Sequence, residues 1–476
     1  MYMPQAKQKS NKSKIEDEKP GKEETIKIRV SVFFDGTLNN RTNINQRLIA
    51  STDGDGQLTE EEQKAALMLS KNVSQTDKSK AVKRYGKFGA TDSEDENSYE
   101  GYYTNVVIME KYVELPSEPK KLHLAIYIEG SGSINKKADQ TSGYAFAIWE
   151  SGIPHKVQQG IESVVSKIKK NHLERDVKIE EIALDIFGFS RGAAAARNFI
   201  HEALDGENAI KKQLTSKYKY KVKSDAVKVC FVGLYDTVST YGFWKTATGI
   251  GESNTKSLKL DSIAKAERVI QLAAANEHRK YFSLTNINSA RGNSREIFLP
   301  GVHSDIGGGY RDNQPEKQVI FEEYGYSRED ALKEIDALIE AGWYNENELF
   351  LDHTMGYEGD EGDETSIIRV VKENVSNKYS RIPLHIMANY ARKNKIKLLS
   401  KLDEDEAIPD ELTDIQGKLL NYITKTKKSK AQHWHGNKEG WLCKLRHDYF
   451  HFSARIKTGH TPRYIKGKRG REIIKG

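Results

Sequence analysis

The run Gly188–Gly192 reads Gly-Phe-Ser-Arg-Gly and places a serine between two glycines at the spacing of a nucleophile elbow. An apolar stretch, 181–187, precedes it, and an alanine-rich stretch, 191–204, follows it. This order predicts a strand, a sharp turn and a helix, with Ser190 on the turn as a nucleophile for acyl transfer. The amide of Arg191 would lie at the helix N-terminus, where unpaired donors favour an oxyanion. The alternative is an ordinary strand-to-helix turn with a small serine.

A serine nucleophile needs a general base and a carboxylate that orients the base. In an open α/β sheet both are expected just past the carboxyl ends of strands. Asp236 follows the apolar run 226–234, and His303 follows the short run 296–299 in a glycine-rich loop. The chain order Ser190, Asp236, His303 is the order found in α/β-hydrolases.

Other residues compete for these two roles. His447 and His451 lie among aromatic residues and are rival bases. Asp305 is a rival carboxylate, but it lies only two residues after His303, so we expect it to shape the loop.

The second oxyanion donor is expected at Asp35-Gly36-Thr37, which follows the β-branched run 26–34. Gly36 lets the backbone approach a substrate closely, so the amides of Gly36 and Thr37 are the candidate donors. The alternative is a simple turn closed by the aspartate side chain.

The elements that must position these residues alternate along the chain. Strands are expected at 26–34, 121–128, 181–187, 226–234 and 296–299, and helices at 142–170, 191–204 and 268–278. This alternation predicts an α/β fold of the α/β-hydrolase type, with a mostly parallel, doubly wound sheet. Beyond residue 310 the pattern favours helices at 328–342 and 414–426, with an acidic loop at 357–365.

The chain divides into three expected parts. Residues 1–25 are a polar leader that we expect to be disordered. Residues 26–310 form the catalytic domain, which carries an insertion at 41–97. Residues 311–476 form a helical extension or small second lobe with a basic tail.

Composition limits the classes of function. The 476 residues carry a net charge of +7 and a mean hydropathy of −0.70, and no run approaches the roughly 18 apolar residues of a transmembrane helix. The first 25 residues lack the apolar core of a signal peptide. Cys230 and Cys443 support no disulfide framework. The basic tail is either solvated or attracted to an anionic surface, and no nucleic-acid-binding motif accompanies it.

Residues 51–62 resemble an EF-hand calcium loop, with a glycine at the sharp turn. Ser51 stands where aspartate is usual, which removes a charge and weakens the expected Ca²⁺ binding. The alternative is an acidic, capped turn that starts a helix. The candidate ligands are Ser51, Asp53, Asp55, Gln57, Thr59 and Glu62.

Four segments in this order resemble the Tle1-like phospholipase family: 33–40, 188–194, 233–238 and 300–310. The resemblance spans residues 26 to about 310. It implies an α/β-hydrolase fold, a triad of Ser190, Asp236 and His303, and hydrolysis of the acyl esters of glycerophospholipids. The triad needs no cofactor, and any Ca²⁺ at 51–62 would be structural.

The resemblance also implies a place in bacterial type VI secretion. Family members are effectors held in the cytoplasm, exported with spike components into the periplasm of a rival cell, and neutralised in the producer by immunity proteins. Three alternatives stay open: an esterase for a non-lipid substrate, a non-catalytic scaffold or adaptor, and a calcium-dependent binding protein. A scaffold relative would be expected to lose a triad residue, and this chain keeps all three.

Overall fold

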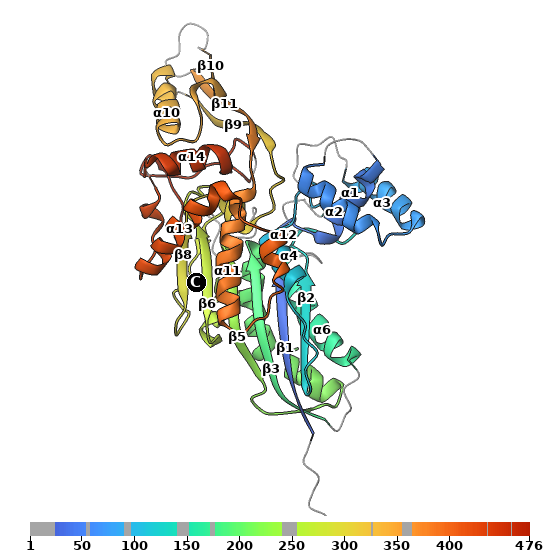
Figure 1. Cartoon of the computed structure of the whole chain (residues 1–476). Helices are drawn as coiled ribbons and strands as arrows, with labels where there is room; N and C mark the ends of the chain where they lie inside the picture. Colours follow the sequence, from blue (N-terminus) through green and yellow to red (C-terminus); the bar gives the residue numbers. More distant parts are fainter. Residues whose placement is uncertain are drawn as a thin grey trace, which may run out of the picture.

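A central parallel sheet organises the molecule (Figure 1). The computed structural model describes residues 24–53, 58–89, 97–139, 152–171, 177–239, 255–324, 327–354, 364–435, 437–457 and 459–476. The strand order is β2-β1-β3-β5-β6-β8, with β4 paired to β3, and every pair is parallel. The bounds are β1 (Thr25–Phe34), β2 (Lys121–Ile128), β3 (Lys178–Phe189), β4 (Lys221–Val222), β5 (Val227–Tyr235), β6 (Val269–Ala274) and β8 (Arg295–Leu299).

Helices cover both faces of this sheet, because successive strand residues point to opposite faces. Phe34 packs with α6 (Ile153–Lys170) and α7 (Arg191–Leu204), whereas Phe33 belongs to the core shared with α4 (Asn105–Tyr112) and α11 (Arg381–Lys393). The predicted doubly wound α/β fold is therefore confirmed.

The register brings three strand ends to one edge. Phe34 pairs with Gly188 across β1 and β3, and Phe189 pairs with Tyr235 across β3 and β5. The residues that follow these ends, including Ser190 and Asp236, therefore lie side by side at the carboxyl edge of the sheet.

The helix expected at 268–278 is wrong. Residues Val269–Ala274 form β6, which lies inside the sheet between β5 and β8, and all six residues are buried. A strand buried on both faces is continuously apolar and lacks the alternation that marks a half-buried strand. The predicted helix at 142–170 is observed as α6 from Ile153, and residues 140–151 lie outside the described part.

The region after residue 310 contains more than the predicted helices. The expected helices are present as α10 (Arg328–Glu340) and α13 (Asp410–Lys425). Beside them lies an antiparallel sheet that the sequence analysis did not anticipate, in the order β10-β11-β9. Its strands are β9 (Gln314–Tyr324), β10 (Leu349–Thr354) and β11 (Thr365–Val375).

The remaining elements are short, apart from the helix α14. They are α8 (Ile210–Lys212), the π-helical turn η2 (Gln213–Lys217), η3 (Leu260–Lys265), β7 (Leu284–Thr285), α9 (His303–Gly307), η4 (Glu346–Glu348), η5 (Lys378–Ser380), α12 (Lys401–Asp405), η6 (Ala431–His433), α14 (Gly440–Tyr449), β12 (Tyr464–Ile465), β13 (Lys468–Arg469) and β14 (Ile473–Ile474). Residues 1–23 of the expected leader and most of the acidic loop, 355–363, lie outside the described residues.

The insertion forms a helical group that projects from the body of the molecule (Figure 1). Its helices are α1 (Arg41–Ala50), α2 (Glu60–Ser70) and α3 (Gln75–Phe88), and both α2 and α3 pack on α1. The Glu62 carboxylate is fully buried and accepts hydrogen bonds from Arg47 at 2.6 Å and Arg311 at 2.8 and 2.9 Å. This ion-pair cluster joins the insertion to the segment that precedes β9.

The same cluster bears on the predicted calcium loop. Glu62, the expected bidentate ligand, forms a capping box with Thr59 at the start of α2 and is held by the two arginines. Ser51–Asp53 form the 3-10 turn η1, while Asp55 and Gln57 lie outside the described residues. Within the part of the chain that is described, no group of three or more His, Cys, Asp or Glu side chains is arranged to hold a metal. Calcium binding by the loop stays a prediction.

Among the described residues, none of the helices combines the length and apolar character needed to span a bilayer.

Glu62→Gln tests the buried ion-pair cluster. The substitution keeps the size of the side chain but leaves the charges of Arg47 and Arg311 uncompensated, so we expect the docking of α2 to weaken by about 3 kcal/mol. Hydrogen exchange of the α1 and α2 amides measures this loss. The exposed Glu60→Gln is the control and should change protection by less than about 0.5 kcal/mol; equal effects of the two variants would contradict the role given to Glu62.

Candidate active site

Ser190 occupies a strained turn between β3 and α7. Its φ of 57° and ψ of −127° lie in a region that residues with a side chain rarely adopt. Its amide donates to the Tyr235 carbonyl at 3.0 Å, and its carbonyl accepts from the amides of Ala193 and Val238. A Cβ on Gly192 would overlap the Asp35 carbonyl, so only glycine lets α7 approach the end of β1. The predicted elbow is therefore present.

Asp236 and His303 form a buried pair beside this turn. Asp236 follows β5 and also has a positive φ, 47°. His303 is the first residue of α9, and its Nδ1 lies 2.5 Å from Asp236 Oδ2. The two side chains are brought together across 67 residues of sequence, as the strand-end argument predicted.

The Phe189 ring connects the segments that carry these residues. The centroid of its ring lies 4.6 Å from that of His303, and the Phe282 ring contacts His303 edge-on at a centroid distance of 5.0 Å. A Cβ on Gly36 or on Gly307 would overlap the Phe189 ring. The two glycines thus allow the first and last of the four sequence segments to close on the elbow.

Burial and neighbouring charges set the protonation of the pair in opposite ways. Burial alone would raise the pKa of Asp236, but the charges of Arg471 and His303 outweigh it, and the pKa lies below its ordinary value. Burial lowers the pKa of His303, and the hydrogen bond to Asp236 only partly opposes this. The pair therefore holds an ionised carboxylate and a neutral imidazole near neutral pH, which is the state of a general base.

Arg471 is the functional residue that the sequence analysis missed. Its guanidinium donates to both Asp236 oxygens, at 2.6 Å to Oδ1 and 2.8 Å to Oδ2. The alternative of a solvated basic tail is wrong at this position, because the Arg471 side chain is buried against Asp236. Arg469 of the same segment pairs with Glu334 at 2.7 Å. No local sequence signal distinguishes Arg471 from the other cations of the tail.

A second buried carboxylate lies close to His303. Glu277 is paired with Arg279 at 2.9 Å and accepts the hydroxyl of Ser453 and the amide of His303. Burial would raise the pKa of Glu277, but Arg279 lowers it well below its ordinary value. This ionised group fixes the start of α9 and with it the position of the His303 backbone.

The predicted oxyanion segment lies against the elbow, but one of its candidate donors already makes a hydrogen bond within the protein. The Gly36 amide donates to the side chain of Asp35 at 2.8 Å, as in the turn alternative, so it would have to leave that oxygen to serve a substrate. The Thr37 hydroxyl accepts from the Arg191 guanidinium at 3.0 Å, and Arg191 begins α7, where backbone amides face outward. The segment and the helix N-terminus thus meet as predicted, and the donor roles of Arg191, Gly36 and Thr37 stay predictions.

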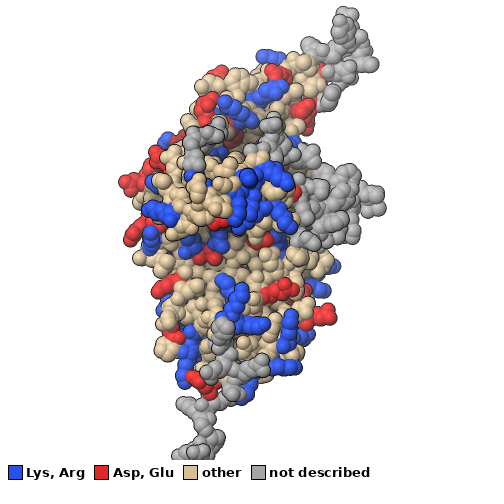
Figure 2. Space-filling view, turned by 90° about the vertical axis from the view of Figure 1, so that its right-hand side faces the viewer, with Lys and Arg blue, Asp and Glu red and all other residues tan. Residues whose placement is uncertain are grey.

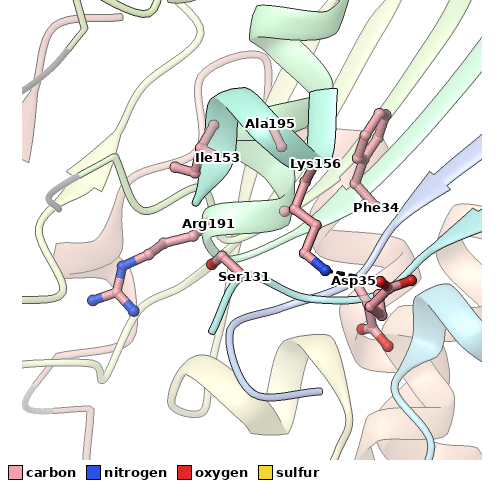
Figure 3. A pocket seen from close by; sticks show the side chains of 9 residues that line it. Phe34, Asp35, Ser131, Ile153, Lys156, Arg191 and Ala195 are labelled. Carbon is pink, nitrogen blue, oxygen red and sulfur yellow. Dashed lines mark hydrogen bonds and ion pairs between the residues drawn. The ribbon is translucent and has the colours of Figure 1, made fainter. Parts of the chain in front are cut away.

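A small pocket lies behind this turn (Figure 3). Lys156 reaches into it and pairs with Glu129 at 2.9 Å, while the Arg191 side chain extends in the opposite direction. The buried ion pair is close to Asp35 and Gly192 and supports the loop between β2 and α6. The pocket is too small for an acyl chain and has a supporting role.

The rival residues have other partners. His451 pairs with Asp305 at 3.0 Å, and Asp305 also accepts the amide of Val302, so Asp305 shapes the loop as expected. His447 pairs with Glu348 and Asp448.

Residues 201–322, which contain Asp236 and His303, match a family model described as "T6SS, Phospholipase effector Tle1-like, catalytic domain". This part of the chain is therefore similar to the catalytic domain of Tle1-like effectors. A solved structure titled "Structure of the Tle1 effector bound to the VgrG spike from the Type 6 secretion system" has the same fold, with a TM-score of 0.58 and 21% identity. The match covers 91% of this chain and 85% of that one, and it confirms the α/β-hydrolase-like fold expected for a Tle1-like protein.

A second solved structure, an uncharacterized protein from Pseudomonas aeruginosa, gives a TM-score of 0.38 at 14% identity and covers 88% of this chain and 56% of its own. No curated protein sequence matches the chain significantly.

Ser190 should react with a fluorophosphonate probe, because the elbow and the Asp236–His303 pair activate its hydroxyl. We expect Ser190→Ala to abolish labelling and the nearby Ser304→Ala to leave it intact, as read by intact-protein mass spectrometry. Since burial lowers the pKa of His303, labelling should fall only as the pH drops through a midpoint below 6.5. Labelling of Ser190→Ala, or a midpoint above 6.5, would contradict the assignment.

Proposed function

We propose that this protein is a serine lipolytic hydrolase that cleaves the acyl esters of glycerophospholipids through Ser190, Asp236 and His303. The observation that carries the proposal is the strained Ser190 turn lying beside the buried Asp236–His303 pair. The description of the matching family model supports the choice of a phospholipase.

In the proposed reaction, His303 Nε2 takes the proton of the Ser190 hydroxyl as its oxygen attacks the ester carbonyl. Asp236 holds the imidazole by Nδ1 and stabilises its charged form. The amides of Arg191 and Thr37, joined by that of Gly36 once it leaves Asp35, receive the developing oxyanion. His303 then protonates the departing lysolipid alcohol, and water hydrolyses the acyl-enzyme to release a fatty acid and restore Ser190.

The insertion supports a membrane surface as the site of action. Leu67 and Met68 on α2 are 62% and 53% exposed, and Val82 on α3 is 46% exposed. Figure 2 views the molecule from the side on which the insertion projects, and Lys and Arg side chains gather there. The exposed lysines of α2, α3 and the turn between them are Lys64, Lys71, Lys80, Lys83 and Lys87. Exposed apolar side chains among lysines suit an anionic lipid surface.

We further propose that the protein is a type VI secretion effector. The matching family model is described as an effector domain, and the solved structure of like fold is titled as bound to the VgrG spike. On this proposal the partners are a spike component, a cognate immunity protein and the phospholipid membrane, and the target compartment is the periplasm of a rival cell.

The deciding experiment is fatty-acid release from phospholipid vesicles by the wild-type protein and by Ser190→Ala. We expect release by the wild type and a loss of at least about a thousandfold in the variant, because the nucleophile is removed. Parallel assays with calcium and with a chelator test whether the loop at 51–62 contributes. Absence of release by folded wild-type protein, together with hydrolysis of a soluble ester, would replace the lipid substrate by a non-lipid ester.

Leu67→Ser combined with Met68→Ser tests the role of the insertion. Removing two exposed apolar side chains lowers the affinity for a bilayer but does not alter the triad. We expect at least about a fivefold lower rate on anionic vesicles and an unchanged rate on a soluble acyl ester. Leu420→Ser, at an exposed leucine of α13, is the matched control and should leave both rates unchanged. Equal loss on both substrates would point to a folding defect and against surface binding.

A further inference from the structure

The Arg471 guanidinium is held rigidly behind Asp236. Besides its two bonds to the carboxylate, its Nε donates to the Phe282 carbonyl at 2.7 Å and its Nη1 to the Ala274 carbonyl at 3.2 Å. Its side chain is only 4% exposed. A planar guanidinium bound through both of its edges has a single orientation, so it presents a fixed fork to the two carboxylate oxygens.

The chain on both sides of Arg471 is anchored as well. Strand β14 pairs in parallel with β7, and the Leu284 amide donates to the Glu472 carbonyl at 2.9 Å. The Glu472 carboxylate accepts from Ser283 and pairs with Arg463 at 3.0 Å. The segment 463–476 therefore returns to the sheet beside the active site, where Figure 1 marks the chain end near β6.

Arg471 completes the set of donors around Asp236. Oδ1 accepts from the Ala274 amide and from Arg471, and Oδ2 accepts from His303 and from Arg471. With two donors on each oxygen, the carboxylate cannot rotate away from His303 without breaking a charge-assisted bond.

Among the described residues, the charged side chains that face this pair are buried. Asp236 and Glu277 are the acidic groups closest to His303, Arg471 and Arg279 are the basic ones, and Glu296 lies within reach of the Arg471 charge. Removing Arg471 therefore leaves an excess of negative charge on buried groups. Burial acts to raise the pKa of Asp236, and the charge of Arg471 is the strongest of the influences that lower it.

We propose that Arg471 is a positioning residue of the catalytic triad, which fixes the orientation of the Asp236 carboxylate and keeps it ionised so that His303 can act as the base. The inference rests on the proposed function, because it assigns Arg471 to the same Ser190–Asp236–His303 chemistry.

Arg471→Gln tests the charge, with the pH dependence of fluorophosphonate labelling as the readout. Loss of a nearby cation raises the pKa of either member of a coupled pair. The acid limb of the pH profile, where labelling falls as the pH drops, should therefore move up by roughly one to two pH units whichever group takes the proton. We therefore expect labelling at pH 6 to fall by at least about threefold. Arg469→Gln removes a partly buried cation of the same segment that contacts Glu334 and Phe452, and it should leave the limb unmoved.

Arg471→Lys separates orientation from charge. Lysine keeps the positive charge but lacks the planar fork, so the acid limb should stay within about half a pH unit of the wild type while the maximal labelling rate falls about tenfold. An unmoved acid limb in Arg471→Gln, or an undiminished maximal rate in Arg471→Lys, would overturn the proposal. If the Gln variant does not fold, the Lys variant alone decides, because its charge keeps the buried Asp236 compensated.

The His303 ring provides a readout that does not need any reaction. Titration of the imidazole by NMR should give a higher pKa in Arg471→Gln than in the wild type and in Arg469→Gln. A wild-type protein that is never labelled at Ser190 would end the proposed hydrolase function, whereas an unchanged His303 titration would end the role of Arg471.

Discussion

A carboxylate out of contact with water has to be neutralised by groups that lie next to it, and Asp236 imposes this condition on the whole active-site edge of the protein. Its partners come from regions far apart in the sequence: an amide from the end of β6, the imidazole that begins α9, and a guanidinium from the segment before β14. Each of these groups is correctly placed only when its own element is docked. The charge of Asp236 therefore couples the edge of the central sheet to the last part of the chain.

Besides the electrostatic constraint from Asp236, the packing of the Phe189 ring imposes a steric constraint around His303. The Phe189 ring occupies space that is available only because Gly36 and Gly307 have no side chains. One aromatic residue next to the nucleophile thus sets the distance between the oxyanion segment, the elbow and the base. Gly192 is required for a similar reason, because a Cβ there would overlap the Asp35 carbonyl, whereas Gly301 and Gly309 have positive φ angles.

The sequence predicted the parts of the site that depend on local order. Ser190, Asp236 and His303 could be found because each follows a strand, and the carboxyl ends of parallel strands share one edge. The strand β6 was mistaken for a helix because its burial on both faces removes the periodicity on which the distinction depends. The strand β9 carries Pro, Glu and Lys, and β11 carries Lys and Glu, residues that weaken the strand signal in a single sequence.

Arg471 could not be predicted for a different reason. It pairs with Asp236 across 235 residues, and it lies in a run of cations whose composition is typical of a solvated tail. Only the pairing of β14 with β7 distinguishes it from its neighbours. Likewise, the capping box of Glu62 could be anticipated from Thr-x-x-Glu spacing, but its two arginine partners come from α1 and from beyond α9.

The separation of 235 positions between Asp236 and Arg471 also orders events during translation. The ribosome makes the strands that carry the nucleophile, the acid and the base long before it makes the arginine, and domains begin to fold as they emerge. Until Arg471 has been made, Asp236 lacks the guanidinium that donates to both of its oxygens. The proposed triad would then be complete only once β14 has paired with β7 and brought Arg471 to Asp236.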